Sequence, residues 1–344
     1  MKKNLLFSFI MVCLSAITYA QPAGWLYEKP FAVTNSSPQL ILNYTMAVTV
    51  NTQALISSGK MQDSGQDIRF GTPCNGTKMF SYFIDSGINT ATTLIYVRID
   101  SLKPNSTRTI YMFYGNPDTT AASSYAALDG PYTMFNNVAP SSPVFNYNFY
   151  NNYGYYDQVG TYFQPNQTLI VTAIGVYSPS SSKKPMNIST IDGTPAIVLS
   201  KTVTPASYTW SFSNLSTPLV ITPLHQYAVS EVLNDSFYDY FYSAIPSFVS
   251  PQVNLLGYTY DILQSGPNLP PYGGVSSTTA FGIMDIKYYV QPNQNSYVSY
   301  IPDTQINGSA YIDPVNKLVC PGTNTNFIAL ASGQATTYQW QVNN

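Results

Sequence analysis

Apolar and polar residues alternate along much of this chain, with the period of a β-strand. Over residues 42–50, Leu, Tyr, Met, Val and Val occupy every second position, and mostly polar residues lie between them. Residues 110–114 and 208–213 repeat the pattern, whereas residues 169–177 are apolar on both faces, as in a central strand. A period of two predicts strands with one buried face.

Turn-forming residues separate these strands, as in Asp63-Ser64-Gly65, Gly115-Asn116-Pro117, Asp192-Gly193 and residues 270–274. Helical periodicity is almost absent, and we expect one short helix over residues 52–58. Many short strands with turn signals between them predict an all-β protein built from tandem β-sandwiches.

The first twenty residues have the composition of a secretory signal peptide. Lys2 and Lys3 precede a mostly apolar run over residues 5–12, and small residues follow at positions 18 and 20, where a signal peptidase would cut after Ala20. The apolar run is shorter than the roughly 20 residues that cross a bilayer. We therefore expect a secreted protein at the cell surface, with residues 1–20 removed.

The rest of the chain is long enough for two domains and part of a third. The turn-rich sequence Asp129-Gly130-Pro131 marks the first boundary. We assign residues 21–128 to a first sandwich, residues 129–302 to a second, and residues 303–344 to the first half of a third.

Four motifs follow one another in the first domain: GWLYEKPFAVTNSS, LISSGKMQDSGQDIRF, FIDSGINTATTLIYVRID and STRTIYMFYGNPDTTAAS. In this order they resemble a family of domains of unknown function that recurs in prokaryotic surface proteins. The resemblance implies a jelly-roll-like sandwich and no reaction. Glu28 stands where the family usually has an arginine, so no role of that arginine carries over.

The later parts of the chain resemble other extracellular modules. Residues 157–290 are similar to sandwiches found beside sugar-active or adhesive modules. Cys320, Phe327 and Tyr338-Gln339-Trp340-Gln341 resemble the first half of an immunoglobulin-like repeat of giant secreted Bacteroidota proteins. Because half a sandwich cannot bury its core, we expect the natural protein to continue beyond residue 344. The resemblance implies a large adhesin, of the type used in gliding motility and exported by type IX secretion.

Charge is scarce. Charged residues make up 9% of the chain, and 14 basic and 16 acidic side chains give a net charge of −2. Removal of the signal peptide takes two lysines and no acid, which leaves 12 basic and 16 acidic residues and a net charge of −4. Without a basic patch, we expect no nucleic-acid partner.

Catalytic groups are also scarce. The single histidine, His225, lies in a turn-like sequence before a strand, and no G-x-S-x-G nucleophile motif is present. Beyond the signal peptide, Glu28 and Glu231 are the only glutamates, which disfavours a carboxylate pair for glycoside hydrolysis. We expect no enzymatic activity and no cofactor.

Asp63 and Asp67 flank Gly65 and offer oxygen ligands for calcium. The simpler interpretation, which we favour, is that Asp63 closes a turn while Asp67 pairs with Arg69 or caps backbone N–H groups. Calcium takes six or more oxygen ligands, and no dense acidic loop is present.

Two tripeptides, Asp100-Ser101-Leu102 and Asp118-Thr119-Thr120, match the O-glycosylation pattern of Bacteroidota. Ser101 and Thr119 are therefore candidate attachment sites. The alternative is an ordinary turn with a side-chain cap. The sequence leaves both interpretations open.

The chain has thirty tyrosines, and two aromatic runs are the densest. Residues 145–156 contain seven aromatics interleaved with asparagines, and residues 237–242 contain five in six positions. Exposed aromatic patches often mark interaction sites, although such rings also fill cores and seams between modules. The candidate ligand-binding residues are Phe149, Tyr150, Tyr153, Tyr155, Tyr156, Tyr238, Tyr240 and Tyr242.

Together these features predict a non-catalytic adhesin or surface-filament component, which binds glycans, surfaces or a cell-surface accessory protein through its sandwiches. The alternative is the carbohydrate-binding front end of a secreted polysaccharide-degrading enzyme with its catalytic module downstream. A third interpretation is a spacer that binds nothing.

Overall fold

The structure, a computed structural model, describes residues 22, 24–72, 78–139, 144–147, 157–233, 239–244, 248–261, 274–302, 310–313 and 328–331. The chain forms two compact units. Unit 1 combines the residues up to Ala127 with those from Gln294 onward, and unit 2 comprises Leu128–Asn293.

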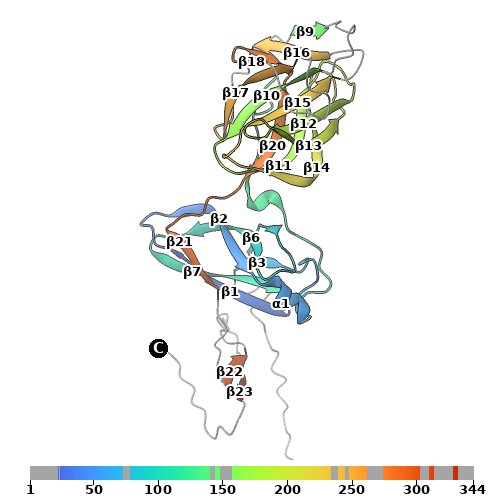
Figure 1. The fold of residues 1–344 in the computed structure, drawn as a ribbon. Helices are drawn as coiled ribbons and strands as arrows, with labels where there is room; N and C mark the ends of the chain where they lie inside the picture. Colours follow the sequence, from blue (N-terminus) through green and yellow to red (C-terminus); the bar gives the residue numbers. More distant parts are fainter. Residues whose placement is uncertain are drawn as a thin grey trace, which may run out of the picture. The chain divides into compact units, whose positions relative to one another are not determined.

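Unit 1 contains two antiparallel sheets around one core, with strand orders β21-β1-β7-β3-β4 and β2-β6-β5 (Figure 1). Its elements are β1 (Tyr27–Asn35), β2 (Ile41–Val50), α1 (Thr52–Ser57), β3 (Arg69–Gly71), β4 (Met79–Phe80), β5 (Tyr82–Ser86), β6 (Thr93–Leu102), β7 (Ser106–Tyr114), the 3-10 helix η1 (Tyr125–Ala127) and β21 (Val298–Pro302). Farther along the chain, β22 (Ala310–Asp313) pairs with β23 (Ile328–Ala331).

The core of unit 1 follows the alternation in the sequence. Met46, Val48 and Val50 of β2 are buried, as the pattern predicts, whereas Leu42 near the start of the strand is 61% exposed. The predicted short helix is α1, which begins after Asn51. The Asn51 side chain accepts a hydrogen bond from the Ala54 N–H at 2.9 Å, as a helix N-cap does.

Unit 1 is discontinuous in sequence, because the chain leaves it after Ala127 and returns at Gln294. On its return, β21 pairs antiparallel with β1, with Ile301 opposite Ala32. The sequence predicts a second domain of residues 129–302, and this pairing places residues 294–302 in unit 1 instead. The partner strand lies near the start of the chain, so no local pattern signals the pairing.

Side chains of the returning segment also cover the free edge of β2. The Ala47 N–H donates to Gln294 Oε1, and the Thr49 N–H donates to the Tyr300 hydroxyl, both at 2.9 Å. Because β2 is the last strand of its sheet, these N–H groups have no neighbouring strand to pair with. The returning segment therefore ties the two sheets of unit 1 together.

Unit 2 is built around two larger antiparallel sheets, with strand orders β13-β12-β15-β10-β17-β18 and β14-β11-β20-β8, and a smaller sheet β19-β16-β9 (Figure 1). Its strands are β8 (Asp129–Thr133), β9 (Val144–Tyr147), β10 (Asp157–Pro165), β11 (Leu169–Tyr177), β12 (Lys184–Thr190), β13 (Ala196–Val203), β14 (Trp210–Ile221), β15 (Tyr227–Leu233), β16 (Asp239–Ala244), β17 (Val253–Asp261), β18 (Gly274–Ser276), β19 (Thr279–Phe281) and β20 (Met284–Val290).

The core of unit 2 lies between its two large sheets. In β11, the strand predicted to be apolar on both faces, every residue except Thr172 is buried. An ion pair shares the interior, since Lys184 Nζ lies 2.9 Å from Glu231 Oε1 and the two side chains are 4% and 2% exposed. Both units are antiparallel β-sandwiches, which confirms the all-β prediction. Within the described residues, no helix combines the length and apolar composition needed to cross a membrane.

Candidate functional site

Most of the aromatic residues predicted to bind a ligand lie outside the described residues. These are Phe149, Tyr150, Tyr153, Tyr155, Tyr156 and Tyr238. Tyr240 and Tyr242 lie on β16, of which the structure describes the backbone. β16 pairs with β9, with Phe241 opposite Phe145, so parts of the two aromatic runs are neighbours in one sheet. Their role in binding stays a prediction.

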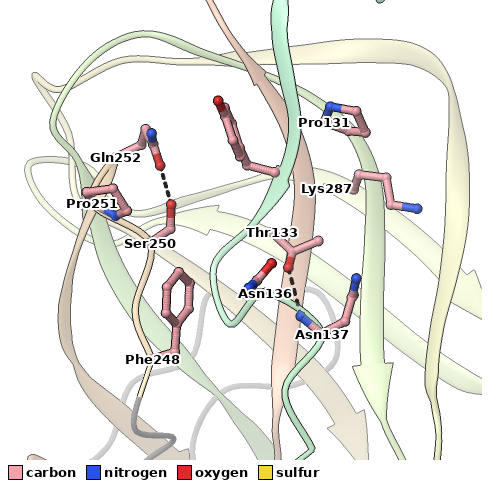
Figure 2. A pocket seen from close by; sticks show the side chains of 10 residues that line it. Pro131, Thr133, Asn136, Asn137, Phe248, Ser250, Pro251, Gln252 and Lys287 are labelled. Atoms are coloured by element: carbon pink, nitrogen blue, oxygen red, sulfur yellow. Dashed lines mark hydrogen bonds between the residues drawn. The ribbon is translucent and has the colours of Figure 1, made fainter.

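A hollow of about 420 Å³ lies in unit 2 at the free edge of β8, the last strand of its sheet. This volume falls within the range of small-ligand sites. The walls come from β8, the turn after it, the segment 248–252 and β20 (Figure 2). The lining residues are Pro131, Tyr132, Thr133, Asn136, Asn137, Phe248, Ser250, Pro251, Gln252 and Lys287.

Residues 133–138 form a tight turn, here called the asparagine turn, on one side of the hollow. Asn136 and Asn137 have φ values of 50° and 55°, a region that asparagine enters more readily than most residues. The Asn137 N–H donates to Thr133 Oγ1 at 3.3 Å. Both asparagine residues are exposed, so their amides are available to a ligand.

A buried carboxylate, Asp285 of β20, anchors the asparagine turn. The Met134 N–H donates to Oδ1 at 2.7 Å, and the Phe135 N–H donates to Oδ2 at 3.1 Å. The Ile286 N–H also donates to Oδ1, at 2.7 Å. Complete burial raises the pKa of Asp285 to about 7, against the opposing effect of these hydrogen bonds. The carboxylate thus fixes the backbone of the turn.

Ser250 connects the other side of the hollow to the core. Its N–H donates to the Met134 carbonyl at 2.8 Å, and the Tyr288 hydroxyl donates to its Oγ at 2.7 Å. The Ser250 hydroxyl donates in turn to Gln252 Oε1 (Figure 2). The Gln252 oxygen accepts this bond, and its amide NH2 group is the donor on the side chain that faces a ligand.

Lys287 is the one charged residue among the ten that line the hollow. Its Nζ lies 4.8 Å from the centroid of the Phe212 ring, which is within cation–π range. The ion pairs found in the described part of the chain do not include Lys287. Its ammonium group is therefore held by an aromatic ring and carries no bound counter-charge there.

An aromatic row positions the Phe212 ring. Phe212 stacks on Trp210 with centroids 5.9 Å apart, and Trp210 stacks on Phe135 at 6.2 Å. Trp210 Nε1 donates to the Val138 carbonyl at 3.0 Å, which joins the row to the asparagine turn. Gly175 makes room for the row, because a Cβ there would lie 2.4 Å from the Phe212 ring.

In unit 1, Asp67 caps backbone N–H groups. It is 0% exposed, and its two oxygens accept the Gln62 N–H at 3.1 Å and the Gly115 N–H at 2.6 Å. Arg69 donates elsewhere, to backbone carbonyls and to the Thr119 hydroxyl. Asp63 is exposed. Within the described residues, no group of three or more His, Cys, Asp or Glu is placed to hold a metal ion.

The two candidate O-glycosylation residues stay predictions. The Thr119 hydroxyl accepts a hydrogen bond from Arg69 Nη2 at 2.8 Å, and Ser101 is half-buried on β6. The neighbouring Asp100 forms ion pairs with Lys78 and Arg108 at 2.7 and 2.6 Å. Partial burial acts to raise the pKa of Asp100, but the hydrogen bonds from these two cations lower it to about 2.

His225 lies in the turn before β15, as the sequence predicts. Its N–H donates to the Thr222 carbonyl at 3.4 Å, and its Nδ1 lies 3.3 Å from Asp192 Oδ1. The side chain is exposed and does not line the hollow.

Comparison with known proteins gives one match. Residues 64–142 match the family model described as Domain of unknown function (DUF2341). This prokaryotic domain includes Asp67, Arg69 and the asparagine turn within the matched residues, which confirms in part the resemblance read from the sequence. No curated protein and no solved structure matches the chain.

The residues that line the hollow are not among those predicted from the sequence. They come from three separated segments, and each segment reads as an ordinary turn or strand. The consecutive Asn136 and Asn137 are a local signal, because asparagine favours turns and positive φ. That signal predicts the turn but not the ligand groups that meet there.

Proposed function

We propose that this chain is a non-catalytic binding protein of the cell surface, an adhesin or filament component that attaches to glycans or other surface ligands. The hollow of unit 2 is the observation that carries the proposal. It combines the amides of Asn136, Asn137 and Gln252 with the Phe248 ring. Amides both donate to and accept from hydroxyl groups, and rings cover apolar sugar faces, so this lining suits a saccharide.

The placement of the acids favours binding over catalysis. A general acid or base must reach a proton of the substrate. Asp285, the carboxylate next to the hollow, accepts three backbone N–H groups and does not line it. The lining itself contains no carboxylate and no histidine.

Export completes the proposal. The signal-peptide composition of residues 1–20 and the low charge support a role outside the cell. In this setting, uncharged amide and hydroxyl groups solvate the surface without attracting counter-ions.

The second candidate is the carbohydrate-binding front end of a secreted polysaccharide-degrading enzyme, which the same hollow supports. The two differ in what the protein does to a bound polysaccharide. An adhesin leaves it intact, whereas an enzyme releases new reducing ends. Incubation of the natural secreted protein with each polysaccharide it binds, followed by a reducing-sugar assay, separates them.

A glycan array probed with labelled residues 21–344 tests the binding function. We expect binding to a limited set of glycans, and at least a tenfold loss of affinity, about 1.4 kcal/mol, in Phe248→Ala and Gln252→Ala. Gln53→Ala is the matched control, because Gln53 is exposed on α1 and distant in sequence from the hollow. Absence of any glycan signal, or equal binding by all variants, contradicts the proposal.

A further inference from the structure

We propose that the ligand of the hollow is an acidic oligosaccharide, a sugar chain that bears carboxylate or sulfate groups, and that Lys287 binds its anionic group. The inference rests on the proposed saccharide-binding function and names its ligand class. It follows from the charge, the support and the position of Lys287.

The charge of Lys287 has no carboxylate partner within the described residues. Lys184, another lysine of unit 2, differs, because it is buried against Glu231 at 2.9 Å. Asp285, two residues before Lys287, forms no ion pair with it among the described residues, and its oxygens accept backbone N–H groups of the asparagine turn and β20. A single cation in an otherwise uncharged lining favours an anionic ligand.

The Phe212 ring holds the ammonium group in place. Nζ lies 4.8 Å from the ring centroid. The ring also stacks on Trp210 and packs against Gly175, and these contacts hold it in place. A half-buried lysine on an aromatic surface is less hydrated than a free lysine, and its interaction with an anion is screened less. Lys287 is thus better prepared to bind an anion than a mobile surface lysine.

The position of Lys287 implies more than one sugar unit. Lys287 is paired with Thr133 of β8 in the sheet. Figure 2 shows Lys287 and Asn137 on one side of the β8 ribbon and Gln252 and Phe248 on the other. A ligand that contacts both groups therefore spans β8. One sugar residue meets Phe248 and Gln252, and another presents its anionic group to Lys287.

Calorimetry with defined oligosaccharides tests the inference. The probes are hexasaccharides of galacturonate, of sulfated galactan and of unsubstituted galactan, each titrated into residues 21–344. We expect at least tenfold tighter binding of one or both acidic probes than of the neutral one, with affinity that falls as NaCl is raised. Which acidic probe binds more tightly tells whether the anionic group is a carboxylate or a sulfate.

Two substitutions isolate Lys287. Lys287→Met is expected to bring the affinity for the acidic probe down to that of the neutral probe and to remove most of the salt dependence. Lys287→Arg is expected to keep the tighter binding of the acidic probe over the neutral one. Lys183→Met is the matched control, because it removes the same charge from an exposed lysine of unit 2 outside the hollow.

The outcomes separate this inference from the proposed function. Binding of neutral and acidic probes with equal affinity, lost in Phe248→Ala but unchanged in Lys287→Met, overturns the acidic ligand and leaves the saccharide site. An equal loss in Lys183→Met and Lys287→Met also overturns it, because the effect is then one of net charge. No binding by any probe or by the glycan array overturns both.

Discussion

The two units differ in what their buried charged residues support. In unit 1 the buried charge of Asp67 lies where loops converge, and its partners are backbone N–H groups of those loops. In unit 2 the pair Lys184–Glu231 lies inside the sandwich, and Asp285 supports the wall of a hollow. Both units are antiparallel sandwiches, so the difference does not come from the fold class.

The loops around Asp67 in unit 1 bind one another. Trp25 Nε1 donates to the Asp67 carbonyl at 2.7 Å, and the Arg69 guanidinium lies 5.6 Å from the Trp25 ring centroid. Arg69 also binds the Thr120 carbonyl at 2.7 Å. These contacts all lie within unit 1 and hold its loops together. In unit 2 the same kind of anchoring leaves amides and a cation facing outward.

The largest expected effect is on the interior pair of unit 2. Lys184→Met leaves Glu231 buried without its cation, which costs about 3–5 kcal/mol of the free energy of unfolding of unit 2. Urea unfolding followed by Trp210 fluorescence, with Trp25 and Trp340 replaced by Phe, measures it. The double variant Lys184→Met, Glu231→Leu restores most of the loss. A loss below 1 kcal/mol in the single variant contradicts the role of the pair.

The next effect is a pH dependence at Asp285. Because its pKa is raised from 3.8 to about 7, its contribution to stability is present below about pH 4 and is lost as the pH rises to about 7. Relative to Asp285→Asn, unit 2 of the wild type should lose up to about 4 kcal/mol between pH 4 and pH 7. Urea unfolding of both proteins, followed by Trp210 fluorescence at several pH values, measures this difference in stability. A difference that does not vary with pH rules out the raised pKa.

Asp67 is the corresponding test in unit 1. Asp67→Asn keeps one oxygen acceptor and places its amide NH2 against the other of the two backbone N–H donors, and we expect a loss of about 2–3 kcal/mol in unit 1. Trp25 fluorescence, with Trp210 and Trp340 replaced by Phe, reports it. Asp63→Asn is the control, because Asp63 is exposed and should show no change. Equal losses of stability in Asp67→Asn and Asp63→Asn would contradict the anchoring role of Asp67.

The smallest effect concerns the edge of β2. Tyr300→Phe removes the acceptor of the Thr49 N–H, which costs unit 1 about 1 kcal/mol and leaves unit 2 unchanged. Tyr297→Phe is the control, because Tyr297 is 57% exposed. The Trp25 titration compares the two. If both variants unfold at the wild-type urea concentration, the returning segment does not hold the β2 edge.

Local patterning explains what the sequence predicts well. The alternation over residues 42–50 and the apolar run 169–177 correspond to β2 and β11, and residues 52–58 contain α1. For Asp67 the sequence leaves three roles open, a calcium ligand, a pair with Arg69 and a cap of backbone N–H groups, and the structure shows the cap. The end of the second domain is different, because β21 is defined by a pairing with β1 that spans the whole of unit 2.

The hollow is beyond sequence reasoning for a similar physical reason. Phe248, Gln252 and Lys287 become neighbours of the asparagine turn only through the order of strands and the bond from Ser250 to Met134. Aromatic density in the sequence instead directs attention to residues 145–156 and 237–242. Density reports composition, whereas a binding site depends on which groups lack partners after folding.

The return of the chain to unit 1 has a mechanical consequence. A pulling force applied at both ends of this chain enters unit 1 through β1 and leaves it through β21, so the inserted unit 2 is off the load path while these strands stay paired. Phe31 is opposite Pro302, and Asn35 is opposite Val298. The force therefore reaches the paired strands at their Pro302 end and separates them one residue pair at a time. While β1 and β21 stay paired, the hollow of unit 2 is not stretched by the applied force.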